Sequence, residues 1–156
     1  KITVAALKYA ILKVNVSDDV AFDLKSSVSF EGDSGTYLLY ILARIKSILR
    51  KEQGTRNKEQ AISHYSLSIT HYEKQLLLQL ASFPEITSQA AVDLDQSKIA
   101  QYLFHLGQAF NTFYQECPVL ESESEIRNFR LQLIQAVAQV MTDGLKLLGI
   151  ETVEEM

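Results

Sequence analysis

The chain has 156 residues, of which 47% are hydrophobic and 22% are charged, and its formal net charge is −4. This composition suits one domain or a pair of small ones, and it excludes a disordered chain and a large multidomain enzyme. The single cysteine, Cys117, excludes an internal disulfide, and every apolar run is shorter than the ~20 residues that span a bilayer. The acidic balance argues against indiscriminate nucleic-acid binding, but not against one local site.

The first half of the chain predicts helices, because its apolar residues recur at helical spacing. Residues 2–14 predict a first helix, and residues 18–33 predict a short helix followed by a turn. Residues 36–52 give the clearest helix, with one apolar arc at ~100° per residue. Its members are Leu38, Ile41, Leu42, Ile45, Ile48 and Leu49. The polar residues 53–69 predict a mobile loop, which is long for a compact domain.

The second half carries clear helix boundaries. Thr70-His71-Tyr72-Glu73 is a capping box, and we expect Pro84 to stop or kink the helix that follows it. Asp95 is placed to cap another helix, which Pro118 ends.

A second capping box, Ser122-Glu123-Ser124-Glu125, begins the final helix, which runs to about Leu148 with Gly149 as its left-handed cap. No strand pattern competes with these helices. The sequence therefore predicts an all-α bundle of about five or six helices.

We expect neither a metal site nor a catalytic centre. His64, His71 and His105 are scattered along the chain and Cys117 stands alone, whereas metal ligands cluster at short spacing. The segment Gly32-Asp33-Ser34-Gly35 is spaced like a phosphate loop, but its acid would repel a phosphate. A helix-start turn is the better interpretation of this segment.

The helix predicted for residues 36–52 has a second, polar and aromatic face. Tyr37, Tyr40, Arg44, Ser47 and Lys51 share an arc of roughly 80° beside the apolar arc. Unpaired bases bind to such a surface by stacking on aromatic rings and guanidinium planes. Alternatively, the tyrosines pack at the edge of the bundle with their hydroxyls in water. The pattern alone favours this second interpretation.

Charge is polarised along the same stretch. Between Arg44 and Glu59 there are six basic and two acidic residues, a local charge of +4 in an acidic chain. This basic segment could position a phosphate backbone, with Lys46, Arg50 and Lys51 as candidate contacts. The alternative is a solvated helix C-terminus, where cations favour the helix dipole.

Several motifs in a fixed order resemble the C-terminal anticodon-binding (DALR-type) domain of arginyl-tRNA synthetases, and the resemblance covers essentially the whole chain. They are Phe22-Asp23-Leu24, Ser29-Phe30-Glu31-Gly32-Asp33-Ser34-Gly35, Tyr37-Leu38-Leu39-Tyr40, Ala43-Arg44-Ile45, Phe83-Pro84-Glu85, Ala109-Phe110-Asn111, Phe113-Tyr114, Cys117-Pro118-Val119-Leu120, Gly144-Leu145 and Leu148-Gly149-Ile150.

The resemblance implies an α-helical bundle, the anticodon-binding domain of a class I aminoacyl-tRNA synthetase, that grips the anticodon loop of arginine tRNA. It implies that Tyr37, Tyr40 and Arg44 face the anticodon, and that Tyr114 and Met156 belong to the same surface. From the residues alone, core packing of Tyr114 and a frayed end at Met156 stay open.

The sequence departs from the family pattern at three positions. The family often has Pro, Gln and His where this chain has Thr36, Leu39 and Leu42. Leu42 joins the apolar arc. Leu39 is expected on an exposed side of the helix, so a polar contact is lost there.

The resemblance also implies what lies outside this chain. It opens on Lys1 rather than Met and lacks the signatures of a class I catalytic domain, so we expect residues 1–156 to be one domain cut from a longer, cytoplasmic enzyme. That enzyme would use ATP, with magnesium, to attach arginine to its tRNA, and this domain would need no cofactor, membrane or DNA. The alternatives are the same bundle from a sibling synthetase, such as the cysteine enzyme, or a helical protein-interaction module.

Overall fold

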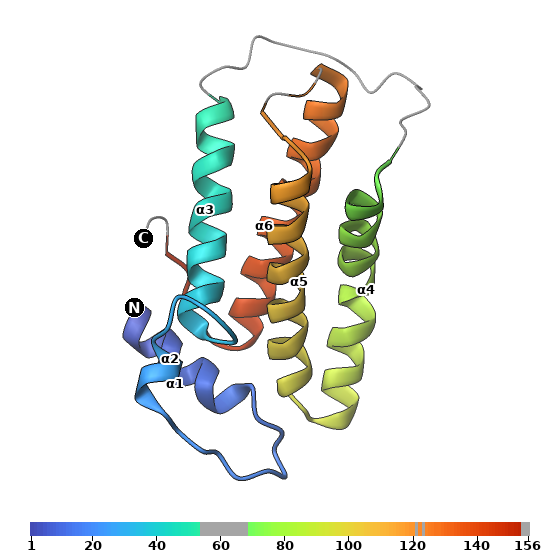
Figure 1. Ribbon diagram of the computed structural model, residues 1–156. Coiled ribbons are helices and arrows are strands. Elements are labelled where there is room, and N and C mark those ends of the chain that lie inside the picture. The colour runs from blue at the N-terminus through green and yellow to red at the C-terminus, as the bar shows by residue number, and fades with distance from the viewer. Residues whose placement is uncertain (54–68, 121, 123, 154–156) are drawn as a thin grey trace.

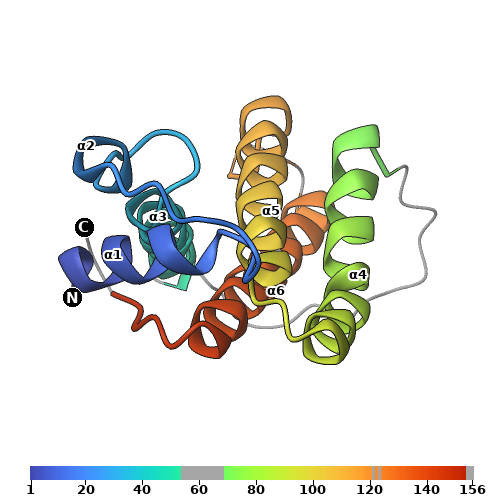
Figure 2. The ribbon, with the colours of Figure 1, turned by 90° about the horizontal axis from the view of Figure 1, so that it is seen from below.

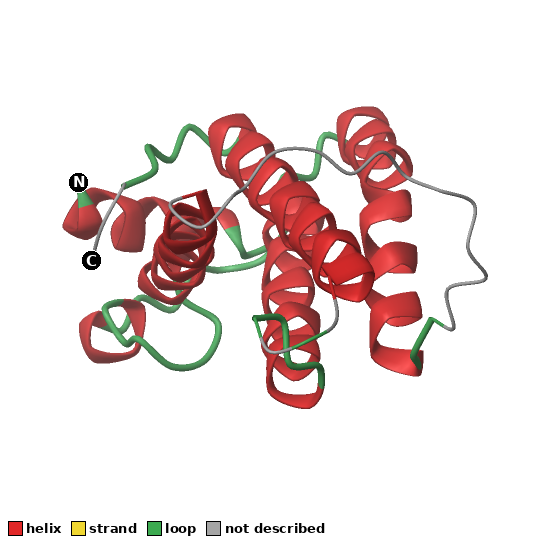
Figure 3. Ribbon diagram, turned by 90° about the horizontal axis from the view of Figure 1, so that it is seen from above, coloured by secondary structure: helices red, strands yellow, loops and turns green. Residues whose placement is uncertain are grey.

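The computed structural model describes residues 1–53, 69–120, 122 and 124–153, and all regular structure in these ranges is helical (Figure 3). The predicted all-α class is therefore confirmed. The residues of the expected mobile loop fall almost wholly outside the described ranges. The helices are α1 (Ile2–Leu12), α2 (Leu24–Ser27), α3 (Gly35–Gln53), α4 (His71–Asp93), α5 (Ser97–Glu116) and α6 (Ser124–Leu147).

Four long helices form the body of the bundle, and the short α1 and α2 lie at one end of α3 (Figures 1 and 2). Helix α5 packs against α4 and α6, and α3 packs against α6, α5 and α1. One contiguous core includes residues of α1, α3, α4, α5 and α6. No helix in the described part of the chain is long and apolar enough to cross a membrane.

Helix α3 is buried on two sides, which corrects one expectation. Leu42 is fully buried as predicted, but Leu39, expected on an exposed side, is also fully buried. Leu39 lies one turn beyond Gly35, and α1 packs so closely there that a methyl group on Gly35 would be 2.8 Å from Cβ of Tyr9. A leucine at position 39 therefore suits the core.

Pro84 does not stop α4, which continues for nine residues beyond it to Asp93, so the expectation of a stop there is wrong. A proline inside a helix removes one backbone donor and pushes the preceding turn apart. Two hydroxyl groups bond the carbonyl of Gln79 in that turn: Ser82 Oγ at 2.8 Å and Tyr102 Oη of α5 at 2.9 Å. Neither bond replaces the donor lost at Pro84, because that donor would serve the carbonyl of Leu80. Burial raises the pKa of Tyr102 to about 12.

The predicted capping box at Thr70 is present, and it is tied to α6. Glu73 accepts a bond from the backbone N–H of Thr70 at 2.7 Å and one from Arg130 Nε at 2.6 Å. Arg130 also donates to the carbonyl of Pro118 and to the hydroxyl of Ser122. Burial raises the pKa of Glu73, but the bonds from Thr70 and Arg130 outweigh it and hold that pKa below its usual value.

The other helix ends lie within a residue or two of the predicted ones, but Asp95 stands one residue before the N-cap of α5, which is Gln96. In the second predicted capping box, Glu123 lies outside the described residues, and the Ser122 hydroxyl bonds the carbonyl of Pro118 and Arg130. The Asp95 carboxylate accepts from the backbone N–H of Ser97 at 3.0 Å, at the start of α5, and α5 ends at Glu116, two residues before Pro118. Helix α6 begins at Ser124, and Gly149 follows it with the expected left-handed backbone (φ +66°).

Candidate nucleic-acid interface

Helix α3 presents Tyr37, Tyr40 and Arg44 on successive turns, as predicted. The exposed fraction of Tyr40 is 42%, whereas Tyr37 and Arg44 are half-buried. None of the three is sealed in the core. At about 100° per residue, they lie within 60° of one another around the helix.

Tyr37 is fixed in the seam between α3 and α5. Its hydroxyl accepts a hydrogen bond of 3.1 Å from the amide of Asn111, and its ring meets Phe104 at 5.7 Å between centroids. Gly107 allows this approach, because a Cβ there would lie 2.9 Å from Ile41 Cδ1 and 3.5 Å from Tyr37 Cε1. Burial raises the pKa of the Tyr37 hydroxyl, and the bond from Asn111 offsets part of that rise.

Tyr40 is the exposed ring of this face. It meets Phe30, from the turn before α3, with centroids 6.3 Å apart and planes 81° apart. Its ring is therefore supported at an edge while a large part of its surface meets solvent. This is the arrangement that lets a flat base stack on the ring.

Arg44 reaches across to α5, where its Cζ lies 4.8 Å from the centroid of the Tyr114 ring. A guanidinium over an aromatic face is held by the ring quadrupole. Tyr114 is half-buried and packs in turn on Phe110, with centroids 5.8 Å apart. Core packing and a place beside Arg44 thus both hold for Tyr114.

The three candidate lysine and arginine contacts do not share one position. Lys46, two residues beyond Arg44, points to roughly the opposite side of α3, where its Nζ lies 3.4 Å from the carbonyl oxygen of Val153. Arg50 and Lys51 are exposed in the last turn of α3. All three take part in interactions within the chain. Met156 lies outside the described residues.

Sequence reasoning gave no role to Asn111, Phe104 or Phe30, which contact the two tyrosines of α3. Phe104, Asn111 and Tyr114 are spaced i, i+7 and i+10, so they share one flank of α5. That spacing was a usable signal. What it could not show is that this flank meets α3.

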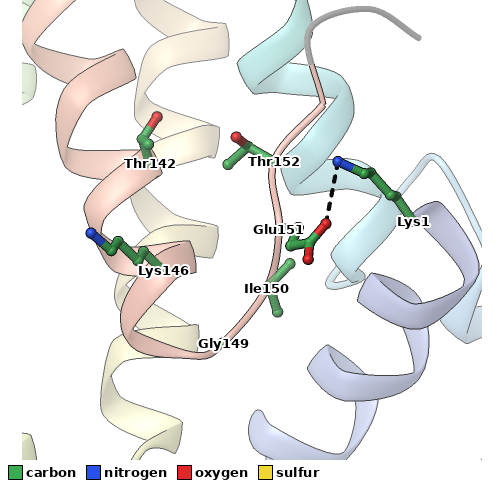
Figure 4. Close-up of a pocket in the computed structure, with 7 residues that line it drawn as sticks. All are labelled: Lys1, Thr142, Lys146, Gly149, Ile150, Glu151 and Thr152. Atoms are coloured by element: carbon green, nitrogen blue, oxygen red, sulfur yellow. Dashed lines mark ion pairs between the residues drawn. The ribbon is translucent and has the colours of Figure 1, made fainter.

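The structure also has an open groove of about 460 Å³ away from these residues (Figure 4). It lies between the end of α6, the segment 149–152 and Lys1, whose Nζ pairs with Glu151 at 3.2 Å. None of the predicted interface residues lines it. In the part of the chain that the structure describes, no group of three or more His, Cys, Asp or Glu side chains could hold a metal ion.

The α3–α5 face therefore offers one exposed ring, one guanidinium layered on a second ring, and a hydroxyl–amide pair behind them. Rings and guanidinium planes can stack on bases, and the guanidinium can also contact phosphate. No acidic side chain belongs to this set.

Comparison with solved structures finds the same bundle in larger proteins. The "Thermus thermophilus arginyl-tRNA synthetase" matches 99% of this chain with a TM-score of 0.89 and 33% identity, over 26% of its own length. The "Arginyl-tRNA Synthetase from Plasmodium falciparum" matches 98% of the chain with a TM-score of 0.82 and 29% identity, over 27% of its own length.

Curated proteins give the same result. An arginine–tRNA ligase of Cyanothece sp. is 37% identical over 154 residues, 98% of this chain and 26% of that protein. One of Thermococcus kodakarensis is 39% identical over 157 residues, 98% of this chain and 24% of that protein. The chain thus spans about a quarter of the length of these relatives. The family profile described as "DALR anticodon binding domain" matches residues 38–156, and the chain therefore belongs to this family.

Proposed function

We propose that this chain is the part of a longer arginyl-tRNA synthetase that recognises the anticodon loop of arginine tRNA. The longer enzyme would attach arginine to the tRNA with ATP and magnesium, through a catalytic part that precedes this domain. The observation that carries the proposal is the α3–α5 face, where half-exposed Tyr40 lies one turn from Arg44, which is itself layered on Tyr114.

Each residue of this face would make a different contact with the RNA. Tyr40 would stack on an unpaired base, because its ring is held at the edge by Phe30 and open to solvent elsewhere. Arg44 would contact a neighbouring base or phosphate from a guanidinium already oriented by Tyr114. Tyr37 would back this surface, since Asn111 and Phe104 hold it in place.

Three basic residues of α3 and the C-terminal Met156 would make further contacts with the anticodon loop. Arg50 and Lys51, in the last turn of α3, would lie along the phosphate backbone, and Lys46 would act from the flank next to Val153. By family resemblance, Met156 would contact the same loop.

The decisive test is binding of an arginine-tRNA anticodon stem-loop to the Tyr40→Ala and Tyr40→Phe variants, measured by fluorescence anisotropy. Stacking contributes ~1–3 kcal/mol per base, so Tyr40→Ala should weaken binding by roughly 5- to 150-fold. Tyr40→Phe keeps the ring and should bind within about twofold of the wild type. Unchanged affinity of a folded Tyr40→Ala variant would remove Tyr40 from the site.

Two further measurements separate the alternatives. Changing the anticodon bases of the stem-loop to those of cysteine tRNA should weaken binding, whereas a domain from the cysteine enzyme would prefer the changed loop. A salt titration should give an affinity that falls linearly with salt on logarithmic axes, because phosphate contacts release counterions. A protein-interaction module would show no such RNA affinity.

A further inference from the structure

Helix α1 carries a second apolar face that nothing in the structure covers. Val4, Leu7 and Ile11 are 55%, 48% and 47% exposed. At 100° per residue they fall within an arc of about 60°, on the side of α1 opposite Tyr9, which is 1% exposed. Helix α1 is thus apolar both toward the bundle and away from it.

Exposed apolar side chains are concentrated in this part of the molecule. Nine of the sixteen large ones found exposed among the described residues belong to residues 1–30. Helix α4 shows the contrast: its exposed Leu78 and Val92 are fourteen residues apart, more than 20 Å along the helix. Single exposed residues are ordinary, whereas a contiguous apolar face marks a contact surface.

The chemistry of this face suits a protein rather than RNA. Its three side chains are aliphatic, so they offer neither an aromatic plane nor a cation. The three lysines in or next to α1 have partners elsewhere: Lys8 donates to the carbonyl of Gly149, Lys1 pairs with Glu151, and Lys13 pairs with Asp33. A helix that is apolar all round is normally buried on both sides.

The comparisons indicate what would cover it. This chain matches the C-terminal domain of synthetases about four times its length, so most of each relative's polypeptide precedes the region equivalent to α1. A preceding domain joined at Ile2 would be held beside the face at high effective concentration. We propose that the face formed by Val4, Leu7 and Ile11 is the surface on which the preceding, catalytic part of the longer protein packs.

The proposal needs the chain to be part of a longer synthetase, and it does not depend on RNA binding. Helix α1 packs on the flank of α3 near Gly35, whereas Tyr37 and Arg44 face α5. Both surfaces can therefore be occupied at once, and each can be tested separately.

Hydroxyl-radical footprinting of the full-length enzyme tests the proposal without a mutation. Leu7 and Ile11 are about half-exposed in this chain. In the full-length enzyme they should be labelled about fivefold less than that exposure predicts, because the preceding domain covers them. Val92 and Leu94, 75% and 81% exposed, are internal references in the same sample. Labelling of Leu7 and Ile11 in proportion to their exposure here would overturn the proposal.

A paired set of variants of the full-length enzyme gives a second test. Leu7→Glu/Ile11→Glu should loosen the domain contact, seen as a larger radius of gyration in small-angle scattering and separate unfolding transitions for the two parts. The control Leu78→Glu/Val92→Glu adds the same charges on α4 and should change neither. If the α1 variant behaves like the wild type, the catalytic part does not cover this face. If the wild-type enzyme is a dimer and this variant is a monomer, a second copy covers the face instead, which also refutes the proposal. Stem-loop affinity, measured on the same samples, reports independently on the RNA face.

Discussion

A buried ion pair between Glu73 and Arg130 joins α4 to α6, and breaking it should be costly. Both residues are nearly inaccessible, 2% and 8% exposed, and their atoms lie 2.6 Å apart. Arg130→Met would leave a buried carboxylate without its charged partner and would remove the bonds that Arg130 donates to Pro118 and Ser122. The carbonyl of Pro118 would keep its bond from the Ser122 hydroxyl, so the unpaired carboxylate dominates the cost. Breaking one side of such a pair costs about 3–5 kcal/mol, a large share of the stability of a domain this size.

The measurement is urea denaturation of the wild type, Arg130→Met and the double variant Glu73→Gln/Arg130→Met, followed by circular dichroism. The double variant should recover about 2 kcal/mol, because a neutral glutamine can still accept from Thr70 and leaves no buried charge. A loss below about 1 kcal/mol for Arg130→Met, which is typical of an exposed ion pair, would refute the reasoning.

The same pair should make stability depend on pH. The pKa of Glu73 is lowered in the folded state, so its contribution is present above the unfolded value of about 4.5 and is lost as the pH falls through the folded pKa. The wild type should therefore lose stability below about pH 4.5 more steeply than Arg130→Met. Parallel pH profiles of the two proteins would show that Arg130 does not set this pKa.

Three other changes have calculable outcomes. Gly35→Ala should destabilise by about 2–3 kcal/mol in thermal melts, despite better helix propensity, because its methyl would lie 2.8 Å from Cβ of Tyr9 and closer still to the backbone of α1. Tyr102→Phe should cost about 1 kcal/mol in urea by removing the bond to the carbonyl of Gln79, and it should abolish the tyrosine that ionises at about pH 12 in an ultraviolet titration. Gly149→Ala should cost about 1 kcal/mol in urea, since its φ of +66° strains any residue with a Cβ.

The fold was largely predictable because its signals are local. Apolar spacing within one helix, the Thr70–Glu73 box and the glycine after α6 each depend on residues within a few positions of one another. The stop considered at Pro84 does not occur, because α4 packs on the core on both sides of the proline, through Leu80 before it and Ala90 after it. Leu39 was misjudged because the covering helix α1 lies far back in the chain.

The sequence also could not show which neighbours surround the two tyrosines of α3. Edge packing and base stacking are the alternatives for the tyrosines of α3, and the structure gives the two rings different surroundings. Tyr37 packs between α3 and α5 with its hydroxyl bonded to Asn111, while Tyr40 is 42% exposed. Because rigid neighbours lower the entropy lost when an exposed group binds, the packed tyrosine favours binding at the exposed one. A half-buried ring beside a half-exposed one therefore suits the stacking role that we propose for Tyr40.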